Sequence, residues 1–519
     1  MAQKALPIGI QDFAKLIQSD CIYVDKTEYY HRLITGGNYF FLSRPRRFGK
    51  SLLISTLKEI FDGNRALFEG LWIHDKIDWE PRPVIRLDFS EIVSRETPFH
   101  ESLDAEMDRV AAEHGLPPLT GDYSSKFRRI IEAVGSKRKV AILVDEYDKP
   151  IISYIDDLDR AQENRAVMKN FYSVIKGNDA HIAFFMLTGV SKFSQVSIFS
   201  DLNNLNDITL DEAYAQMLGY TEAEILKYFP DYLSQLQAKW ADIFPDVLPE
   251  IKKWYNGYSW DGQQLVYNPF SILNLFSKND FLDYWFATGT PTFLTKLIRL
   301  RGYSVFDLKG QVVSLRSFNA FDIPQLEINS LLFQTGYLTI KKRDRMRQTV
   351  TLDFPNLEVA NAFSFHLLTE FSEKGQEGTD ALVLRMANQL LEGNVDAFIA
   401  ALQSLFAGIA YPNQPTGNSG LENYEKYYHT MFYLVLKLLG YDVQAEVMTN
   451  TGRIDTVVTT EHYIYVMEFK LGDAASAMAQ IRERGYHQQY LGSGKTIVLV
   501  GIGFDVATRN VGEVLVERV

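Results

Sequence analysis

Two separate groups of residues in this 519-residue chain have the types and spacing to do chemistry. Near the C-terminus, Glu468 and Lys470 interrupt the apolar run Tyr463–Leu471, and Asp455 lies in the segment before it. Far earlier, the run Arg44-Pro-Arg-Arg-Phe-Gly-Lys-Ser51 ends in the Gly-Lys-Ser triplet of phosphate-binding loops. The two patterns predict a metal-dependent phosphodiesterase site and a nucleotide phosphate site in one polypeptide.

The C-terminal group needs two neighbouring strands. Residues two apart in a strand point to the same side, so Glu468 and Lys470 should project together, with Asp455 on the adjoining strand. Asp455 and Glu468 offer hard oxygen ligands for Mg²⁺, which would polarise a phosphate and lower the pKa of a bound water, while Lys470 orients that water or stabilises developing charge. Charges in so apolar a run are costly unless paired or bound to an ion, which favours a site over a solvated surface.

A helix is expected just before these strands, over residues 421–440, ending on a glycine. Glu425 and His429 are four residues apart and would share one face of it. Glu425 could complete the outer shell of the metal or hold a second ion. For His429 we expect a supporting or packing role.

The phosphate-loop pattern lies between a predicted strand, Asn38–Ser43, and a predicted helix, Ser51–Phe61. At such a junction the backbone N–H groups of Arg47 to Ser51 can cradle phosphates, Lys50 can neutralise them and the Ser51 hydroxyl can bind Mg²⁺. The nucleotide-binding residues predicted here are Arg47, Phe48, Gly49, Lys50 and Ser51. Arg44 departs from the usual pattern, which has a glycine at that place.

Two further strands supply partners for this loop. The run Lys139–Asp148 is an apolar strand ending in carboxylates, a Walker B pattern in which Asp145 would hold Mg²⁺ and Glu146 would activate the attacking water. The apolar run Ile182–Gly189 follows after a helical interval, as in a doubly wound parallel sheet. Thr188, and less strongly Lys192, could sense a γ-phosphate there, although both could also be ordinary loop residues.

A family resemblance covers about residues 5–215. The runs Leu6–Gly9, Tyr23–Thr27, Phe41–Leu52 and Leu67–Leu71 resemble the AAA-ATPase-like family of bacterial and archaeal proteins, in which Arg-Pro-Arg-Arg-Phe-Gly-Lys-Ser is the usual form of the loop. The missing glycine is therefore a family trait. The resemblance implies ATP and Mg²⁺ as cofactors, and the run Trp254–Tyr258 extends it into the middle of the chain.

The middle of the chain is rich in aromatic residues without a recognisable catalytic set. Between residues 323 and 372 the pattern is a helix, two strands and a helix, which suggests a winged-helix unit. The basic turn Lys341–Arg347 would then be the tip of a wing that meets phosphates. The alternative is a packing module that clamps the ATPase core, and periodicity does not separate the two.

The C-terminal order of a helix with Glu, a strand with Asp, a strand with Glu-X-Lys, a helix and a strand resembles the PD-(D/E)XK nuclease superfamily. More narrowly, Glu425–His429, Gly452–Asp455, Glu468–Lys470, Ala479–Ile481 and Tyr486 resemble the nuclease-like domain that commonly follows this ATPase family, over about residues 395–519. The resemblance implies that Gln480 assists the active centre. Ile454 stands where the superfamily has its name-giving Pro.

Composition limits the alternatives. A net charge of −12 disfavours a large cationic groove. The longest apolar runs fall short of the roughly 20 residues that a bilayer crossing needs, and the start lacks a secretory signal, so the sequence predicts a cytoplasmic protein that does not enter a membrane. Cys21 is the single cysteine, so any metal must be held by oxygen or imidazole ligands.

Together these features predict an α/β protein with three parts. Residues 1–215 form an AAA-ATPase-like P-loop domain with a doubly wound parallel sheet, residues 216–390 a helical and winged-helix-like region, and residues 395–519 an α/β, restriction-endonuclease-like domain. The predicted function is ATP hydrolysis coupled to Mg²⁺-dependent DNA cleavage, with nucleotide state controlling the cut; the resemblance suggests defence against foreign DNA. The alternative is a nucleotide-switched module that binds a nucleic acid or partner without cutting, and a homo-oligomer is compatible with either.

Overall fold

The protein is described by a computed structural model that divides into two compact units. One comprises residues 1–289 and 310–359, the other residues 290–309 and 360–519. The residues described are 3–154, 157–192, 204–285, 310–318, 328–372, 375–407, 432, 434–439, 442–448, 453–505, 507–508 and 510–519. Within them, no helix is both long and apolar enough to cross a membrane.

The first unit is built on a parallel sheet of five strands in the order β2-β3-β4-β1-β5. Its strands are β1 (Tyr39–Ser43), β2 (Val84–Asp88), β3 (Val140–Asp145), β4 (Ile182–Gly189) and β5 (Asn206–Asp207). β1, β3 and β4 are apolar and almost wholly buried, as expected for strands covered on both faces. β4 lies between the strand that precedes the phosphate loop and the strand that ends in Asp145.

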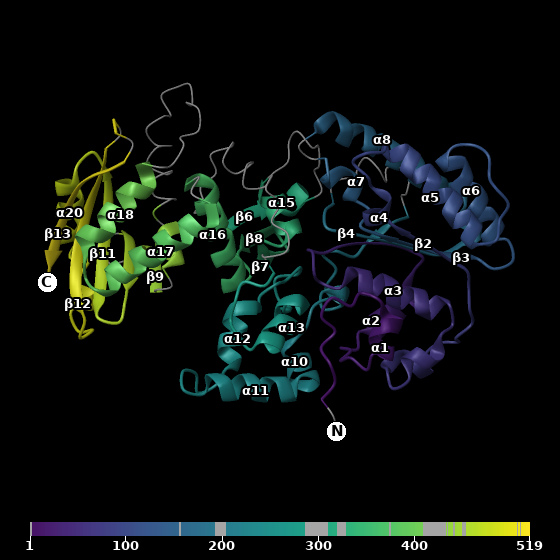
Figure 1. Cartoon of the computed structure of the whole chain (residues 1–519), viewed down its shortest axis with the longest axis horizontal. Helices are drawn as coiled ribbons and strands as arrows, with labels where there is room; N and C mark the ends of the chain where they lie inside the picture. The colour runs from purple at the N-terminus through teal and green to yellow at the C-terminus, as the bar shows by residue number, and fades with distance from the viewer. Residues whose placement is uncertain are drawn as a thin grey trace. The chain divides into compact units, whose positions relative to one another are not determined.

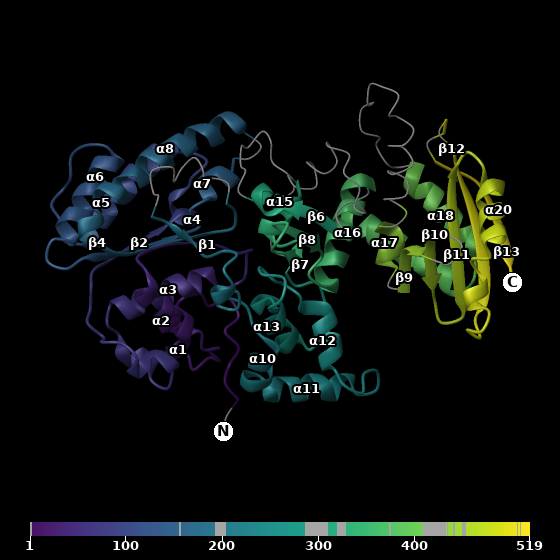
Figure 2. The same ribbon diagram turned by 180° about the vertical axis from the view of Figure 1, so that it is seen from behind.

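Helices cover both faces of this sheet (Figure 1). They are α1 (Phe13–Gln18), α2 (Thr27–Gly36), α3 (Lys50–Phe61), α4 (Phe89–Ile92), α5 (Phe99–Glu113), α6 (Tyr123–Val134), α7 (Lys149–Ile152) and α8 (Leu158–Gly177). Figures 1 and 2 show α1, α2 and α3 on one side and α4 to α8 on the other. The doubly wound arrangement is the one predicted.

The middle of the chain completes the first unit with helices and a small sheet. The helices are α10 (Glu222–Tyr228), α11 (Pro230–Trp240), α12 (Leu248–Tyr255), α13 (Pro269–Lys278) and α15 (Ile328–Thr335). The sheet has the order β6-β8-β7 and is antiparallel, with β6 (Gln311–Ser314), β7 (Thr339–Asp344) and β8 (Thr349–Asp353). Helix α16 (Leu357–Ser372) follows, so the predicted order of helix, two strands and helix is present, with β6 as an additional strand.

The basic turn of this hairpin contacts the chain itself. The Lys341 amine donates to the Pro355 carbonyl at 2.9 Å, and the Arg343 guanidinium donates to the Leu210 carbonyl at 3.5 Å. Arg345 pairs with Glu212 at 2.5 Å. Because these three cations contact the chain itself, the contacts favour a module that packs against the ATPase core over a wing tip in which every cation is available to phosphates.

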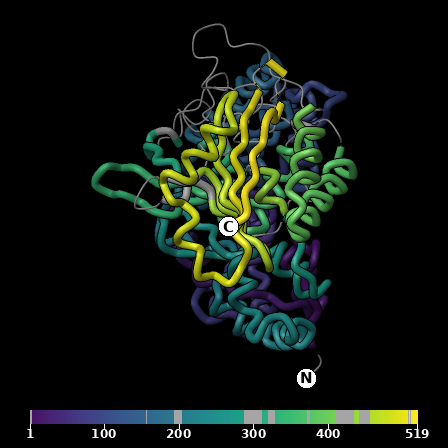
Figure 3. The backbone as a smooth tube through the Cα atoms, turned by 90° about the vertical axis from the view of Figure 1, so that its left-hand side faces the viewer, coloured from purple at the N-terminus to yellow at the C-terminus, as the bar shows by residue number. Residues whose placement is uncertain are grey.

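The second unit contains a mixed sheet of five strands in the order β13-β12-β11-β10-β9 (Figure 3). The strands are β9 (Asp442–Met448), β10 (Arg453–Thr459), β11 (Tyr463–Leu471), β12 (Thr496–Asp505) and β13 (Asn510–Arg518). β11 and β12 are parallel and joined by α20 (Ala474–Arg484); the other neighbours are antiparallel.

Different elements pack on the two faces of this sheet. α20 packs on one face over an apolar cluster that includes Val466, Met478 and Leu499. On the other face, the Phe469 ring packs against the ring of Phe432, and the Tyr465 hydroxyl donates to the Leu390 carbonyl. Figures 1 and 2 show the helices α17 (Gly375–Leu391) and α18 (Val395–Ala407) beside that face. The α/β class, with a parallel N-terminal sheet, a helical middle and a C-terminal sheet domain, is confirmed.

Candidate functional site

The phosphate loop lies between β1 and α3, as its sequence predicts. Gly49, with φ of +92°, is the residue before the helix, and Lys50 and Ser51 form its first turn. A left-handed backbone of this kind favours glycine. The Lys50 amine donates to the carbonyls of Arg44 and Pro45, both at 3.0 Å, so it lies across the loop. Burial lowers the pKa of Lys50, and the nearby Asp145 and Glu146 oppose that shift.

Arg44, which stands where most phosphate loops have a glycine, is an internal anchor. Its side chain is buried, with 1% exposed, and its guanidinium donates to the carbonyls of Ser43, Thr209 and Tyr214 at 2.9, 2.8 and 3.3 Å. It also lies 4.0 Å from the ring centre of Trp260. Burial lowers its pKa to about 9. These contacts explain how a loop without the first glycine keeps a defined shape.

The other loop residues differ in their exposure. Arg47 is exposed, has φ of +68°, and its guanidinium lies 4.9 Å from the ring centre of Phe270. The Phe48 ring is buried edge-on against Tyr258 and Trp260, with centroids 4.8 and 5.4 Å away. The Phe48 side chain is therefore a packing group.

The carboxylates at the end of β3 face the end of β4. The Thr188 hydroxyl donates to Asp145 Oδ1 at 2.5 Å, whereas Asp145 Oδ2 is buried and has no hydrogen-bond partner among the described residues. Glu146 follows with φ of +49°, and burial raises its pKa. An unpaired buried carboxylate oxygen is costly, and a bound cation is a common way to compensate it. The arrangement therefore fits Mg²⁺ at Asp145.

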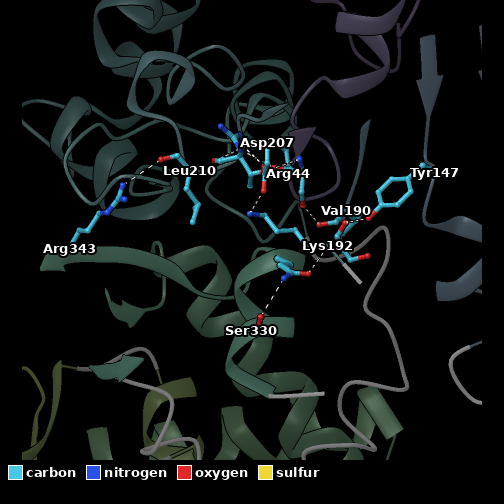
Figure 4. A network of polar contacts seen from close by, with 12 residues as sticks. Arg44, Tyr147, Val190, Lys192, Asp207, Leu210, Ser330 and Arg343 are labelled. Atoms are coloured by element: carbon cyan, nitrogen blue, oxygen red, sulfur yellow. Dashed lines mark hydrogen bonds and ion pairs between the residues drawn. The ribbon is translucent and has the colours of Figure 1, made fainter. Parts of the chain in front are cut away.

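The segment after β4 is held by two acidic residues. Asp148 Oδ2 accepts from the backbone N–H groups of Val190 and Ser191 at 3.0 and 2.6 Å and from the Ser191 hydroxyl at 2.7 Å. The Lys192 amine, a candidate γ-phosphate sensor, is paired with Asp207 at 2.7 Å and is 4% exposed (Figure 4). Sequence reasoning gave Asp148 no role, although its place in the acidic run after β3 could have indicated one.

In the second unit, Asp455 and Glu468 lie together on neighbouring strands. The antiparallel register ends with Thr456 opposite Met467, and Asp455 and Glu468 come next along the two strands. The Asp455 backbone N–H donates to Glu468 Oε2 at 3.3 Å, and Asp455 Oδ2 accepts from the Phe469 N–H at 3.0 Å. The predicted pair of oxygen ligands is thus in mutual contact.

Lys470 and Gln480 complete this cluster. The Lys470 amine is 3.9 Å from Glu468 Oε1 and 38% exposed, and the Gln480 amide donates to the same oxygen. α20 can come close because β12 has glycines beside Glu468 and Lys470: a Cβ at Gly501 would lie 2.8 Å from the Ala474 carbonyl oxygen.

Burial makes the Glu468 carboxyl a weaker acid than usual. Its side chain is 1% exposed, and this burial, with the neighbouring Asp455 charge, raises its pKa to about 8; Lys470 and Gln480 oppose the shift. A carboxyl group with so raised a pKa is typical of functional sites. Asp455 and Glu468 are a chemically suitable pair for Mg²⁺. Among the described residues no group of three or more His, Cys, Asp or Glu gathers as a metal site, and Glu425 and His429 lie outside those residues.

Family models match one region toward each end of the chain. A family model described as "Predicted AAA-ATPase" matches residues 7–199, and one described as "PD-(D/E)XK nuclease superfamily" matches residues 423–514. The chain therefore belongs to the AAA-ATPase-like proteins that carry a C-terminal PD-(D/E)XK nuclease superfamily domain. It is 40% identical over 530 residues to an "Uncharacterized protein in vnfD 5'region" of Azotobacter chroococcum mcd 1, a match that covers 100% of this chain and 99% of the relative.

Proposed function

We propose that this protein hydrolyses ATP at the loop Arg44–Ser51 and cleaves DNA with Mg²⁺ at Asp455 and Glu468, with nucleotide state controlling the cut. The observation that carries the proposal is the contact cluster of Asp455, Glu468, Lys470 and Gln480 in a domain of the nuclease superfamily. Glu468 is buried at the end of an apolar strand, where an ionised carboxylate is costly even beside the partly exposed Lys470 amine.

At the nuclease site the chain would divide the work among four side chains. Asp455 and Glu468 would hold Mg²⁺, which when bound polarises the scissile phosphate and acidifies a water molecule. Gln480 fixes the orientation of the Glu468 carboxyl through their hydrogen bond. Lys470, whose amine is partly exposed beside Glu468, is placed to orient the attacking water and to stabilise charge on the phosphate.

At the nucleotide site the roles follow the contacts around the loop. Lys50 and the N–H groups of Arg47 to Ser51 would bind phosphates, with Phe48 contributing its backbone alone. Ser51 and Asp145 would hold Mg²⁺, and Glu146 would accept the proton of the attacking water. Thr188, bonded to Asp145, would position that carboxylate rather than contact the nucleotide directly.

The decisive test measures both activities in one set of variants. Wild-type protein with Mg²⁺ should nick or degrade DNA, whereas Asp455→Ala and Lys470→Ala should reduce cleavage at least a hundredfold and retain ATP hydrolysis. Lys50→Ala should lose ATP hydrolysis. The assay should include linear, circular, single-stranded and branched DNA with and without ATP.

The alternative, a nucleotide-switched module that binds without cutting, makes a different prediction. Wild type and Asp455→Ala would then behave alike on every DNA and RNA substrate, and the nuclease proposal would fail. A nuclease whose cutting is the same with ATP, without ATP and in Lys50→Ala would refute the proposed control by nucleotide.

A further inference from the structure

The phosphate loop is packed from outside by the middle of the chain. Pro45 lies against Gly336, where a Cβ would come within 2.7 Å of the Pro45 Cβ. Arg44 and Phe48 contact Trp260, and Arg47 lies over Phe270. Residues far along the sequence therefore determine the shape of this loop.

Arg46 connects the loop to Trp285, outside the loop. Its backbone carbonyl accepts a hydrogen bond from the indole Nε1 of Trp285 at 3.2 Å. The backbone N–H of Trp285 donates in turn to Glu358 Oε1 at 2.8 Å. The Ser271 hydroxyl of α13 lies 3.0 and 2.8 Å from the two oxygens of Glu358. A short series of hydrogen bonds thus joins the loop to Glu358; the bond at Arg46 is partly buried and the bonds at Glu358 are buried.

Glu358 occupies a special place in the chain. It is the second residue of α16, and its side chain is fully buried. The first unit ends at Val359, and from Ala360 onward the helix belongs to the unit that contains Asp455 and Glu468.

We propose that Trp285 is a positioning residue for the phosphate loop and that, through Glu358, it makes the first turn of α16 sensitive to bound nucleotide. The inference rests on the proposed ATP site at Lys50. By fixing the Arg46 carbonyl, the indole orients the neighbouring N–H groups before a phosphate arrives, and such preorganisation increases affinity. Conversely, phosphates that bind the N–H groups of the loop shift the Arg46 carbonyl and so alter its hydrogen bond to Trp285. The hydrogen bond from the Trp285 N–H to Glu358 then changes as well.

The substitution Trp285→Phe tests this in the full-length protein, because it removes the indole N–H and keeps an aromatic ring. Loss of one such bond should raise KM for ATP about threefold to tenfold with little change in kcat. Trp240→Phe is the matched control: its indole donates to the Asn279 carbonyl at 3.0 Å, away from the loop, and KM should stay within about twofold. Melting temperatures measured for both variants report whether they fold.

Hydrogen exchange of residues 357–372 supplies a second measurement that is independent of DNA cleavage. With Mg²⁺ and a non-hydrolysable ATP analogue at saturation, wild type and Trp240→Phe should show slower exchange at the start of α16, and Trp285→Phe should lose most of that change. If Trp285→Phe matches Trp240→Phe in both KM and exchange, the link does not exist, although the ATPase proposal stands. If wild type binds no nucleotide, the ATPase proposal itself fails, and the link fails with it.

Discussion

The raised pKa of Glu468 makes a quantitative prediction about Mg²⁺ binding. The carboxyl has a pKa of about 8 in place of 4.5, so it is mostly neutral at pH 7. Since a neutral carboxyl must lose its proton to bind a divalent cation, the apparent affinity for Mg²⁺ should rise about tenfold per pH unit between about pH 6 and 8, or about 1.4 kcal/mol per unit, and level off above. The folded protein favours the protonated form of Glu468. In the absence of metal, the free energy of unfolding should therefore fall as pH rises from about 4.5 to about 8.

Calorimetric titration of Mg²⁺ in two buffers of different ionisation enthalpy counts the protons released. Without nucleotide, about 0.9 proton per ion should appear at pH 7, about half at pH 8 and about 0.1 at pH 9. Glu468→Gln is the matched variant, because its amide keeps the shape of the side chain but has no titratable proton. The nucleotide site is left intact. Subtracting its signal removes any Mg²⁺ bound elsewhere.

If the Mg²⁺ affinity attributable to Glu468 is the same at pH 6 and pH 8, the carboxyl is ionised throughout and burial does not control the site. Proton release that persists unchanged in Glu468→Gln would likewise place the titrating group elsewhere.

Two further substitutions test the packing that positions each site. Gly501→Ala places a methyl 2.8 Å from the Ala474 carbonyl oxygen and 2.8 Å from the Met478 nitrogen, so it should lower the free energy of unfolding by about 1–3 kcal/mol and slow DNA cleavage; an unchanged melting curve would contradict the close approach of α20. Thr188→Val leaves Asp145 Oδ1 without its hydroxyl donor, at a cost of about 1–3 kcal/mol, and should lower kcat for ATP at least several-fold. Equal kcat in the two proteins would mean that Thr188 does not position Asp145.

The proximity of Glu468, Lys470 and Gln480 could be predicted because it is local, whereas the role of each stays a prediction. β11 has the predicted bounds, Tyr463–Leu471, and Glu468 contacts Gln480 only 12 residues later. Strand alternation fixes which side chains project together, so Glu468, Lys470 and Phe469 could be assigned to faces without tertiary information. The raised pKa of Glu468 was not predictable, because it depends on how closely α20 packs against β12.

The nucleotide half was less predictable because its contacts span long stretches of chain. The loop and its helix were evident from the sequence, but the insertion of β4 between β1 and β3 follows from the order of the sheet, which periodicity does not encode. Arg44 looked like a substitution for glycine, whereas its partners are carbonyls 165 and 170 residues away. The sequence pattern does not indicate the short strand β6, and it does not decide the role of the basic turn, because the Arg345 partner Glu212 is far away in sequence.

The distance along the chain between the phosphate loop and its anchors also affects how the protein is made. Arg46 precedes Trp285 by 239 residues. At 5–20 residues per second, a ribosome needs roughly 10 to 50 s to synthesise that interval. Throughout that time the nascent chain carries a phosphate loop that lacks the Trp285 hydrogen bond and the Gly336 contact. Full affinity for nucleotide therefore arises only after more than half of the chain has been made, and a chain truncated before Trp285 should bind ATP more weakly.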